Sequence, residues 1–184
     1  TSGDMEKAVD HLRKAGILKA AKRAERATGQ GLISSYVHAG AKLAVLVEVN
    51  CETDFVARTD QFQAFAKDVA MHIAAQNPMV VSREQLPADA LDRERAIYKE
   101  QALAAGKPAN IVDRIVDGKI EKYYSEVCLL EQPFVKDTDI TVEDLLKQTI
   151  ATLGENIRVS RFVRMELGET APEGQEEASG ACCV

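Results

Sequence analysis

Residues 43–59 read LAVLVEVNCETDFVART, and this stretch joins a strand pattern to a helix pattern. Its first half is apolar at every second position, as on one buried face of a strand, at Leu43, Val45, Val47 and Val49. After Thr59 the apolar residues recur at the spacing of a helix. Residues 50–58 must therefore connect two elements, and we expect them at the surface, where connections usually lie.

The connection 50–58 places an aromatic residue, Phe55, close to the acidic residues Glu52 and Asp54. One interpretation is that Phe55 packs onto the following helix as a hydrophobic staple, with Asp54 as a turn or capping residue. The other is that both side chains are offered to a partner. The pattern of residues alone leaves both interpretations open.

Two further strand patterns lie upstream and downstream of this stretch. Residues 32–37 alternate in strand fashion and reach the next strand through a short turn that contains Gly40, which is typical of a β-hairpin. Residues 157–167 alternate between apolar and polar side chains, as in a strand with one face in water. The simplest arrangement is a sheet of three antiparallel strands.

Most of the remaining chain has helical periodicity. One helix is predicted from about 61 to 76, and two more run over about 88–105 and 109–130. The joint between the last two is so short that they must form an antiparallel helical hairpin. A further helix begins after Thr141 and ends at Gly154. We predict an α+β fold, with a three-stranded antiparallel sheet packed with helices and a protruding helical hairpin.

These patterns divide the chain into three parts. Residues 1–27 hold a helix at about 4–15, ended by Gly16, and a basic, Lys- and Arg-rich helix at about 17–27. Residues 28–168 form the core domain, with the helical hairpin inserted at about 88–131. Residues 169–184 are acidic and are expected to be a flexible tail. The first residue is Thr1 rather than Met, so we expect a further segment upstream.

Composition excludes several classes of function. The 184-residue chain has a formal net charge of −6, and this charge disfavours a nonspecific grip on nucleic acid. The apolar runs are shorter than the roughly 20 residues that span a bilayer, and the start does not resemble a signal peptide. Cys51 and Cys128 are isolated, and Cys182 and Cys183 are adjacent. We therefore expect a cytoplasmic protein without disulfides or a zinc site.

Catalytic and cofactor motifs are weak. The three histidines, His11, His38 and His72, fall on different predicted elements, and His72 is at the edge of an apolar stripe, where a packed histidine is common. Cys51 beside Glu52 could be a thiol nucleophile, but no histidine is tied to it by spacing. Gly40-Ala41-Lys42 and Gly118-Lys119 lack the upstream glycine and the following serine or threonine that a phosphate loop requires. The sequence thus predicts that the protein is not an enzyme and binds neither a metal nor a cofactor. A thiol enzyme that uses Cys51 is the alternative.

The stretch 49–58, with Phe62, Phe65 and the segments 71–74 and 77–78, resembles the characteristic region of the elongation factor Ts family. Further segments of likeness are 6–9, 12–13, 19–22, 130–135, 154–157 and 161–162. The likeness extends from about residue 4 to residue 168. It implies a short, bacterial or organellar translation factor, of whose N-terminal helical module only the last helix is present here.

The resemblance also implies a function and a site. Proteins of this family exchange guanine nucleotide on elongation factor Tu by disturbing its magnesium site. The residues that match the inserted motif here are Thr53, Asp54, Phe55 and Val56. Residues expected to support the loop are Cys51, Arg58 and His72. The alternative is an adaptor that binds a GTPase or a ribosome-associated partner through the helical hairpin.

The resemblance raises one further point, self-association. Short members can form homodimers through the sheet, in some cases with a cysteine in the last strand. At the matching position this chain has Val163, so a disulfide there is excluded while noncovalent dimerisation stays open. The expected partners are thus elongation factor Tu and a second copy, without direct nucleic-acid or membrane contact.

Overall fold

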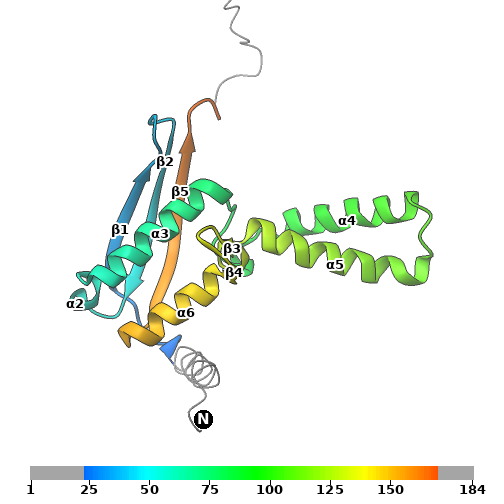
Figure 1. Cartoon of the computed structure of the whole chain (residues 1–184). Coiled ribbons are helices and arrows are strands. Elements are labelled where there is room, and N and C mark those ends of the chain that lie inside the picture. The colour runs from blue at the N-terminus through cyan, green and yellow to red at the C-terminus, as the bar shows by residue number, and fades with distance from the viewer. Residues whose placement is uncertain (1–22, 170–184) are drawn as a thin grey trace, which may run out of the picture.

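The computed structural model describes residues 23–169, which form a sheet, helices on one of its faces and a projecting helical hairpin (Figure 1). The elements are, in order, β1 (Gln30–Val37), β2 (Leu43–Cys51), α2 (Asp54–Ala57), α3 (Asp60–Gln76), η1 (Arg83–Gln85), α4 (Ala88–Ala104), α5 (Ala109–Val127), η2 (Leu129–Glu131), β3 (Pro133–Phe134), β4 (Asp137–Thr141), α6 (Val142–Leu153) and β5 (Ile157–Glu166). The helix predicted at 4–15, most of that at 17–27 and nearly all of the tail lie outside the described residues.

The main sheet confirms the predicted α+β fold. Strand β2 lies between β1 and β5, and both pairings are antiparallel. The face of β2 that was predicted to be buried is almost inaccessible to solvent at Val45, Val47 and Val49. The pairing of β2 with β5 shifts register between Glu48 and Val49.

Helix α3 lies across the buried face of the sheet and supplies much of the core (Figure 1). Its side chains Phe62, Val69 and Ile73 are fully buried, and burial of each such side chain stabilises the fold by about 1.5–3 kcal/mol. The helix ends at Asn77, which adopts the left-handed conformation with φ of 47°. This residue and the following proline stop the helix where the sequence predicted.

Helix α6 packs beside α3 and leads into β5. Its first turn is held by a capping box, in which Thr141 and Asp144 bond to each other's backbone N–H groups. Gly154 ends the helix with φ of 80°, a conformation that favours glycine. Both ends of α6 therefore follow from local sequence, as predicted.

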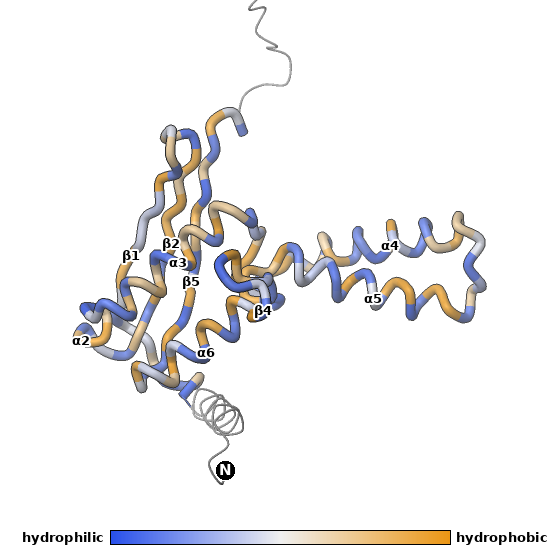
Figure 2. The backbone as a smooth tube through the Cα atoms, viewed as in Figure 1, coloured by the Kyte–Doolittle hydropathy of each residue, from blue (hydrophilic) through white to orange (hydrophobic). Residues whose placement is uncertain are grey.

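Helices α4 and α5 form the antiparallel hairpin, which projects away from the sheet (Figure 1). A separate small core joins the two helices, at Ala102, Val112, Val116 and Ile120. Figure 2 shows apolar segments along both helices of the hairpin, alternating with hydrophilic ones. The hairpin is thus held together by its own side chains.

The structure corrects the predicted end of the second hairpin helix. Helix α5 ends at Val127 rather than near Leu130, because Cys128 turns into an extended conformation and forms a parallel bridge with Val80. The N–H of Leu129 donates to the carbonyl of Val80 at 2.9 Å. The small sheet formed by β3 and β4 was not predicted at all.

Polar contacts fix the base of the hairpin. Arg83 forms ion pairs with Glu131 and, at 2.8 Å, with Glu121, and its guanidinium carbon lies 4.1 Å from the centre of the Tyr124 ring. Arg83 precedes α4 while its partners lie on α5 and η2. These contacts therefore hold the two ends of the hairpin together.

The other face of the sheet carries apolar side chains that no element of residues 23–169 covers. Exposed apolar residues occur on all three strands, with exposed fractions of 52–68%, at Ile33, Val37, Leu46, Val163 and Met165. Leu46 and Val163 are directly opposite each other in the β2–β5 register. We call these five residues the open face. Among the described helices, none is long and apolar enough to cross a membrane.

Candidate functional site

The connection after β2 contains a short helix rather than an irregular loop. Strand β2 ends at Cys51, and α2 begins at Asp54 and is only four residues long. Thr53 is its N-cap, and the Thr53 hydroxyl accepts a hydrogen bond from the N–H of Val56 at 3.4 Å. We call residues 53–58 the Phe55 turn. It is held at the end of the sheet next to the start of α3 (Figure 1).

The two sides of the Phe55 turn differ in burial. Val56 is half-buried against the core, and Ala57 is buried. Phe55, between them and the cap, is 86% exposed. The hydrophobic-staple interpretation is therefore wrong for this structure, because a staple would be covered by the following helix.

Asp54 lies next to Phe55 on the outer side of the turn. Its carboxylate forms an ion pair with the guanidinium group of Arg58 at 2.5 Å, and both side chains are largely exposed. An exposed pair at this spacing on a helix contributes only about 0.3–0.5 kcal/mol. The carboxylate can thus change partners at little cost.

Cys51 lies beneath the turn. Its side chain is fully buried, and its thiol donates a hydrogen bond to the carbonyl of Thr53 at 3.1 Å. Burial and, to a smaller degree, the negative charge of Glu155 raise the pKa of this thiol. A thiol that is buried and kept protonated is a poor nucleophile, so the structure disfavours the thiol-enzyme alternative.

A pair of carboxylates connects the turn to the junction between α6 and β5. Glu155 accepts two hydrogen bonds from Thr53, from the hydroxyl at 2.6 Å and from the backbone N–H at 3.0 Å. In the opposite direction, Glu52 accepts a bond from the N–H of Asn156 at 2.6 Å. We call this reciprocal set the junction clasp. Glu155 is not among the site residues predicted from sequence, although segment 154–157 belongs to the likeness to the family.

The structure brings together six of the seven residues named from sequence, but not His72. His72 lies near the other end of α3, and the twelve-residue separation from Asp60 corresponds to about 18 Å of helix. It is fully buried and bonds to Gln132 at 2.9 Å. His72 therefore supports the base of the hairpin rather than the Phe55 turn.

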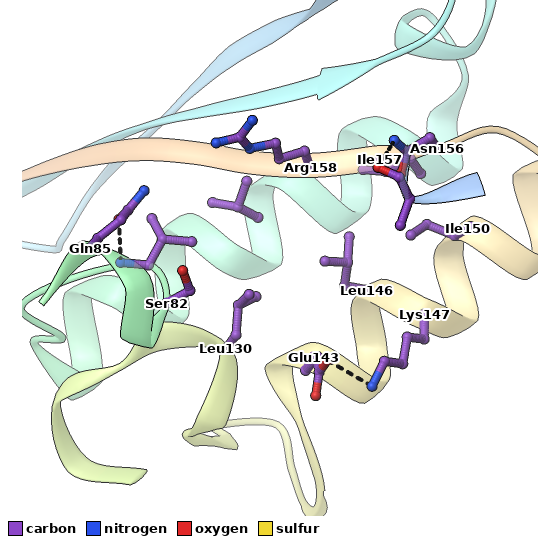
Figure 3. A pocket seen from close by; sticks show the side chains of 13 residues that line it. Ser82, Gln85, Leu130, Glu143, Leu146, Lys147, Ile150, Asn156, Ile157 and Arg158 are labelled. Carbon is purple, nitrogen blue, oxygen red and sulfur yellow. Dashed lines mark hydrogen bonds and ion pairs between the residues drawn. The ribbon is translucent and has the colours of Figure 1, made fainter. Parts of the chain in front are cut away.

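A cavity of about 410 Å³ lies between α6, β5 and η1 (Figure 3). Its wall is mainly apolar, with Leu130, Leu146 and Ile150 among the lining residues, and Lys147 pairs with Glu143 at 2.7 Å on one side. Among residues 23–169, those that line the cavity include no histidine or cysteine. Within residues 23–169 no three acidic, histidine or cysteine side chains lie together as a metal site would require.

Comparison with known proteins decides the family. A family model described as "Elongation factor TS" matches residues 18–169. The chain belongs to the elongation factor Ts family. It is 57% identical to elongation factor Ts of Geobacter sulfurreducens over 169 residues, which are 92% of this chain and 78% of that protein.

Other relatives are similar to the same extent. Elongation factor Ts of Heliobacterium modesticaldum is 53% identical, with 96% of this chain and 82% of that protein covered. That of Desulfosudis oleivorans is 57% identical, with 91% and 84% covered. The resemblance inferred from the sequence is confirmed, and the protein is a translation elongation factor that acts in protein synthesis.

Proposed function

We propose that this member of the elongation factor Ts family promotes release of GDP from elongation factor Tu by inserting residues 53–56 near the partner's magnesium site. The observation that carries the proposal is the exposure of Phe55, 86% on a helix whose next two residues are anchored in the core. A large apolar side chain held out in water contributes little to the packing of residues 23–169. Its burial in a partner pocket would contribute about 1.5–3 kcal/mol.

Asp54 has a complementary role in the proposal. Within the described part of the chain its carboxylate is paired with the exposed Arg58 alone, at 2.5 Å, and it can turn to donors on a partner. Mg²⁺ requires near-ideal octahedral oxygen geometry and neutralises the nucleotide phosphates. If the Phe55 ring and the Asp54 carboxylate shift the surroundings of the partner's magnesium ion, they weaken nucleotide binding.

Thermodynamic coupling makes this action an exchange. If the factor weakens nucleotide binding, nucleotide weakens binding of the factor by the same ratio, so incoming GTP displaces it. No covalent step, cofactor or bound metal of this chain is required. We therefore infer a factor that is not an enzyme. We further infer that it is cytoplasmic and that its partner is a protein rather than nucleic acid or membrane. We assign its core domain to residues 28–168.

The test is release of a fluorescent GDP analogue from elongation factor Tu. The chain is expected to accelerate release, and Asp54→Ala and Phe55→Ala are expected to lose most of the acceleration while remaining folded. Met79→Ala removes another exposed apolar side chain, away from the turn, and is expected to retain it. Binding without acceleration would contradict the proposal and favour an adaptor that uses the helical hairpin.

We further propose that two copies associate through the open face. Its five apolar residues extend over all three strands, and apolar patches of this kind often mark protein contacts. In a two-fold dimer the same patch meets itself, so one self-complementary surface is sufficient. The association would be noncovalent, because β5 carries Val163 where a cysteine could form a bridge.

A further inference from the structure

We propose that Glu155 is the positioning residue that fixes the Phe55 turn in the orientation needed for exchange. This inference rests on the proposed function, and it concerns a residue outside the inserted stretch 53–56. Glu155 follows α6 in the chain, 102 positions from Thr53, yet its carboxylate accepts hydrogen bonds from both donor groups of that residue.

The short helix α2 cannot hold its own geometry. A four-residue helix is too short to be stable alone, because helix nucleation is costly. Its C-terminal half is anchored by Val56 and Ala57 in the core. Its N-terminal half carries the exposed Asp54 and Phe55 and is attached through Thr53. The position of Thr53 thus decides where these two side chains point.

Glu155 also determines which way the Thr53 hydroxyl is oriented. A hydroxyl has one hydrogen, and here it is donated to Oε1 of Glu155 at 2.6 Å. The lone pairs of the same oxygen are then left to accept the N–H of Val56, the capping bond of α2. The second carboxylate oxygen accepts the N–H of Thr53 at 3.0 Å. The Glu155 side chain therefore fixes both the backbone N–H of Thr53 and the Thr53 hydroxyl that caps α2.

The carboxylate is itself well supported. Gly154, just before it, ends α6 in the left-handed conformation. The side chain of Asn156, just after it, donates to the carbonyls of Ala24 at 3.2 Å and Arg26 at 2.8 Å. The N–H of Asn156 donates to the carboxylate of Glu52, the residue that directly follows β2. Glu155 therefore stands on a fixed segment and can transmit that rigidity to the turn.

The experiment compares Glu155→Gln, Glu155→Ala, Thr53→Val and Thr53→Ser in the GDP-release assay. The maximum release rate at saturating factor and the concentration for half-maximal effect are measured separately. We expect Glu155→Gln and Thr53→Val to lower the maximum rate roughly tenfold, the equivalent of one lost charge-assisted hydrogen bond. Thr53→Ser keeps the hydroxyl and is expected to retain most of the rate.

A double variant and a control separate positioning from general stability. If the two residues act as one unit, Glu155→Gln combined with Thr53→Val is no slower than either alone. Glu143→Gln changes a carboxylate at the opposite end of α6, paired with Lys147, and is expected to leave the rate unchanged. A variant that is only less stable has less active protein, which shifts the half-maximal concentration but not the maximum rate.

The outcomes distinguish this inference from the proposed function. If the parent chain accelerates release and Phe55→Ala abolishes it, while Glu155→Gln and Thr53→Val keep the full maximum rate, the positioning role is overturned and the proposed function stands. If the parent chain does not accelerate release, the proposed function fails first. Should Glu155→Ala not fold, the comparison of Thr53→Val with Thr53→Ser decides, since both change only the donor side of the contact.

Discussion

The backbone N–H of Val135 donates a hydrogen bond to Nδ1 of His72 at 3.2 Å. A backbone N–H can only donate, so Nδ1 carries no hydrogen and Nε2 carries it instead. Nε2 then donates to Oε1 of Gln132 at 2.9 Å. The Gln132 amide in turn donates to the carbonyl of Glu126 at 2.6 Å, at the end of α5. The neutral ring thus connects α3 to the base of the hairpin, and a proton on Nδ1 would leave the N–H of Val135 without its acceptor.

The first prediction concerns stability at acid pH. Burial lowers the pKa of His72, and the bond to Gln132 offsets this only in part. The unfolded chain therefore takes up the proton first. The contribution of His72 to stability is complete above its unfolded pKa of about 6.5 and is lost as pH falls from there toward the lower folded pKa. Urea unfolding between pH 7.5 and 5 is expected to show this loss.

The control for this prediction is the exposed His38. His72→Gln is expected to reduce the dependence of unfolding free energy on pH in this range, whatever its effect at pH 7.5. His38→Gln is expected to keep the dependence of the parent. An unchanged slope in His72→Gln would show that other groups cause the acid sensitivity.

The second prediction separates the function of Phe55 from the fold. Phe55 is 86% exposed while Phe62 is fully buried. We expect Phe55→Ala to change the unfolding free energy by no more than about 0.5 kcal/mol and to lose GDP-release activity. Phe62→Ala is expected to cost about 3–5 kcal/mol. Chemical denaturation measures both variants, and a large loss of stability in Phe55→Ala would refute the exposed position.

The third prediction concerns two glycines. Gly31 has φ of 145°, and a Cβ there would lie 2.2 Å from the carbonyl oxygen of Val49 in the neighbouring strand. Gly31→Ala is therefore expected to destabilise the β1–β2 pairing by more than about 1 kcal/mol. Gly118, in α5, has open space around its Cα.

Gly118→Ala provides the matched comparison. In the interior of a helix, alanine is favoured over glycine by about 0.5–1 kcal/mol, so this variant is expected to be as stable as the parent or more so. Thermal unfolding, followed by circular dichroism, measures both. Equal melting temperatures for the two variants would contradict the close approach at Gly31.

The fourth prediction tests self-association. Val163 is 55% exposed on the open face, opposite Leu46. Val163→Glu places a charge in the centre of the proposed dimer contact and is expected to give monomers in sedimentation velocity. Leu103→Glu changes a similarly exposed residue, 51%, on the hairpin and is expected to leave the mass unchanged. A parent chain that sediments as a monomer at all concentrations would refute the dimer.

Local signals explain which elements could be predicted from sequence. Both ends of α6 were found because Thr141 caps the first turn and Gly154 terminates the last. Apolar residues at every second position of β2 predicted which of its faces is buried. By contrast, the end of α5 depends on backbone pairing between Cys128 and Val80, which no local pattern contains.

The candidate site shows the same limit. The sequence placed Phe55 at a junction between strand and helix, but only the fold shows that α3 leaves it uncovered. Glu155 was missed as part of the site because its partner, Thr53, is 102 positions away. His72 was placed with the turn on the strength of the resemblance alone, while its packing puts it at the hairpin base.

The hairpin insertion also affects how the sheet is completed during synthesis. The hairpin lies in the sequence between β2 and β5, which pair in the sheet. Asn50 and Ser160, whose side chains form a hydrogen bond between these strands, are 110 positions apart. At typical elongation rates the ribosome needs roughly 5–20 s to cover that distance. The hairpin contacts are local and can form early, whereas the sheet must wait. A translation factor of this design thus depends on the ribosome to deliver β5 before its own central strand is paired on both sides.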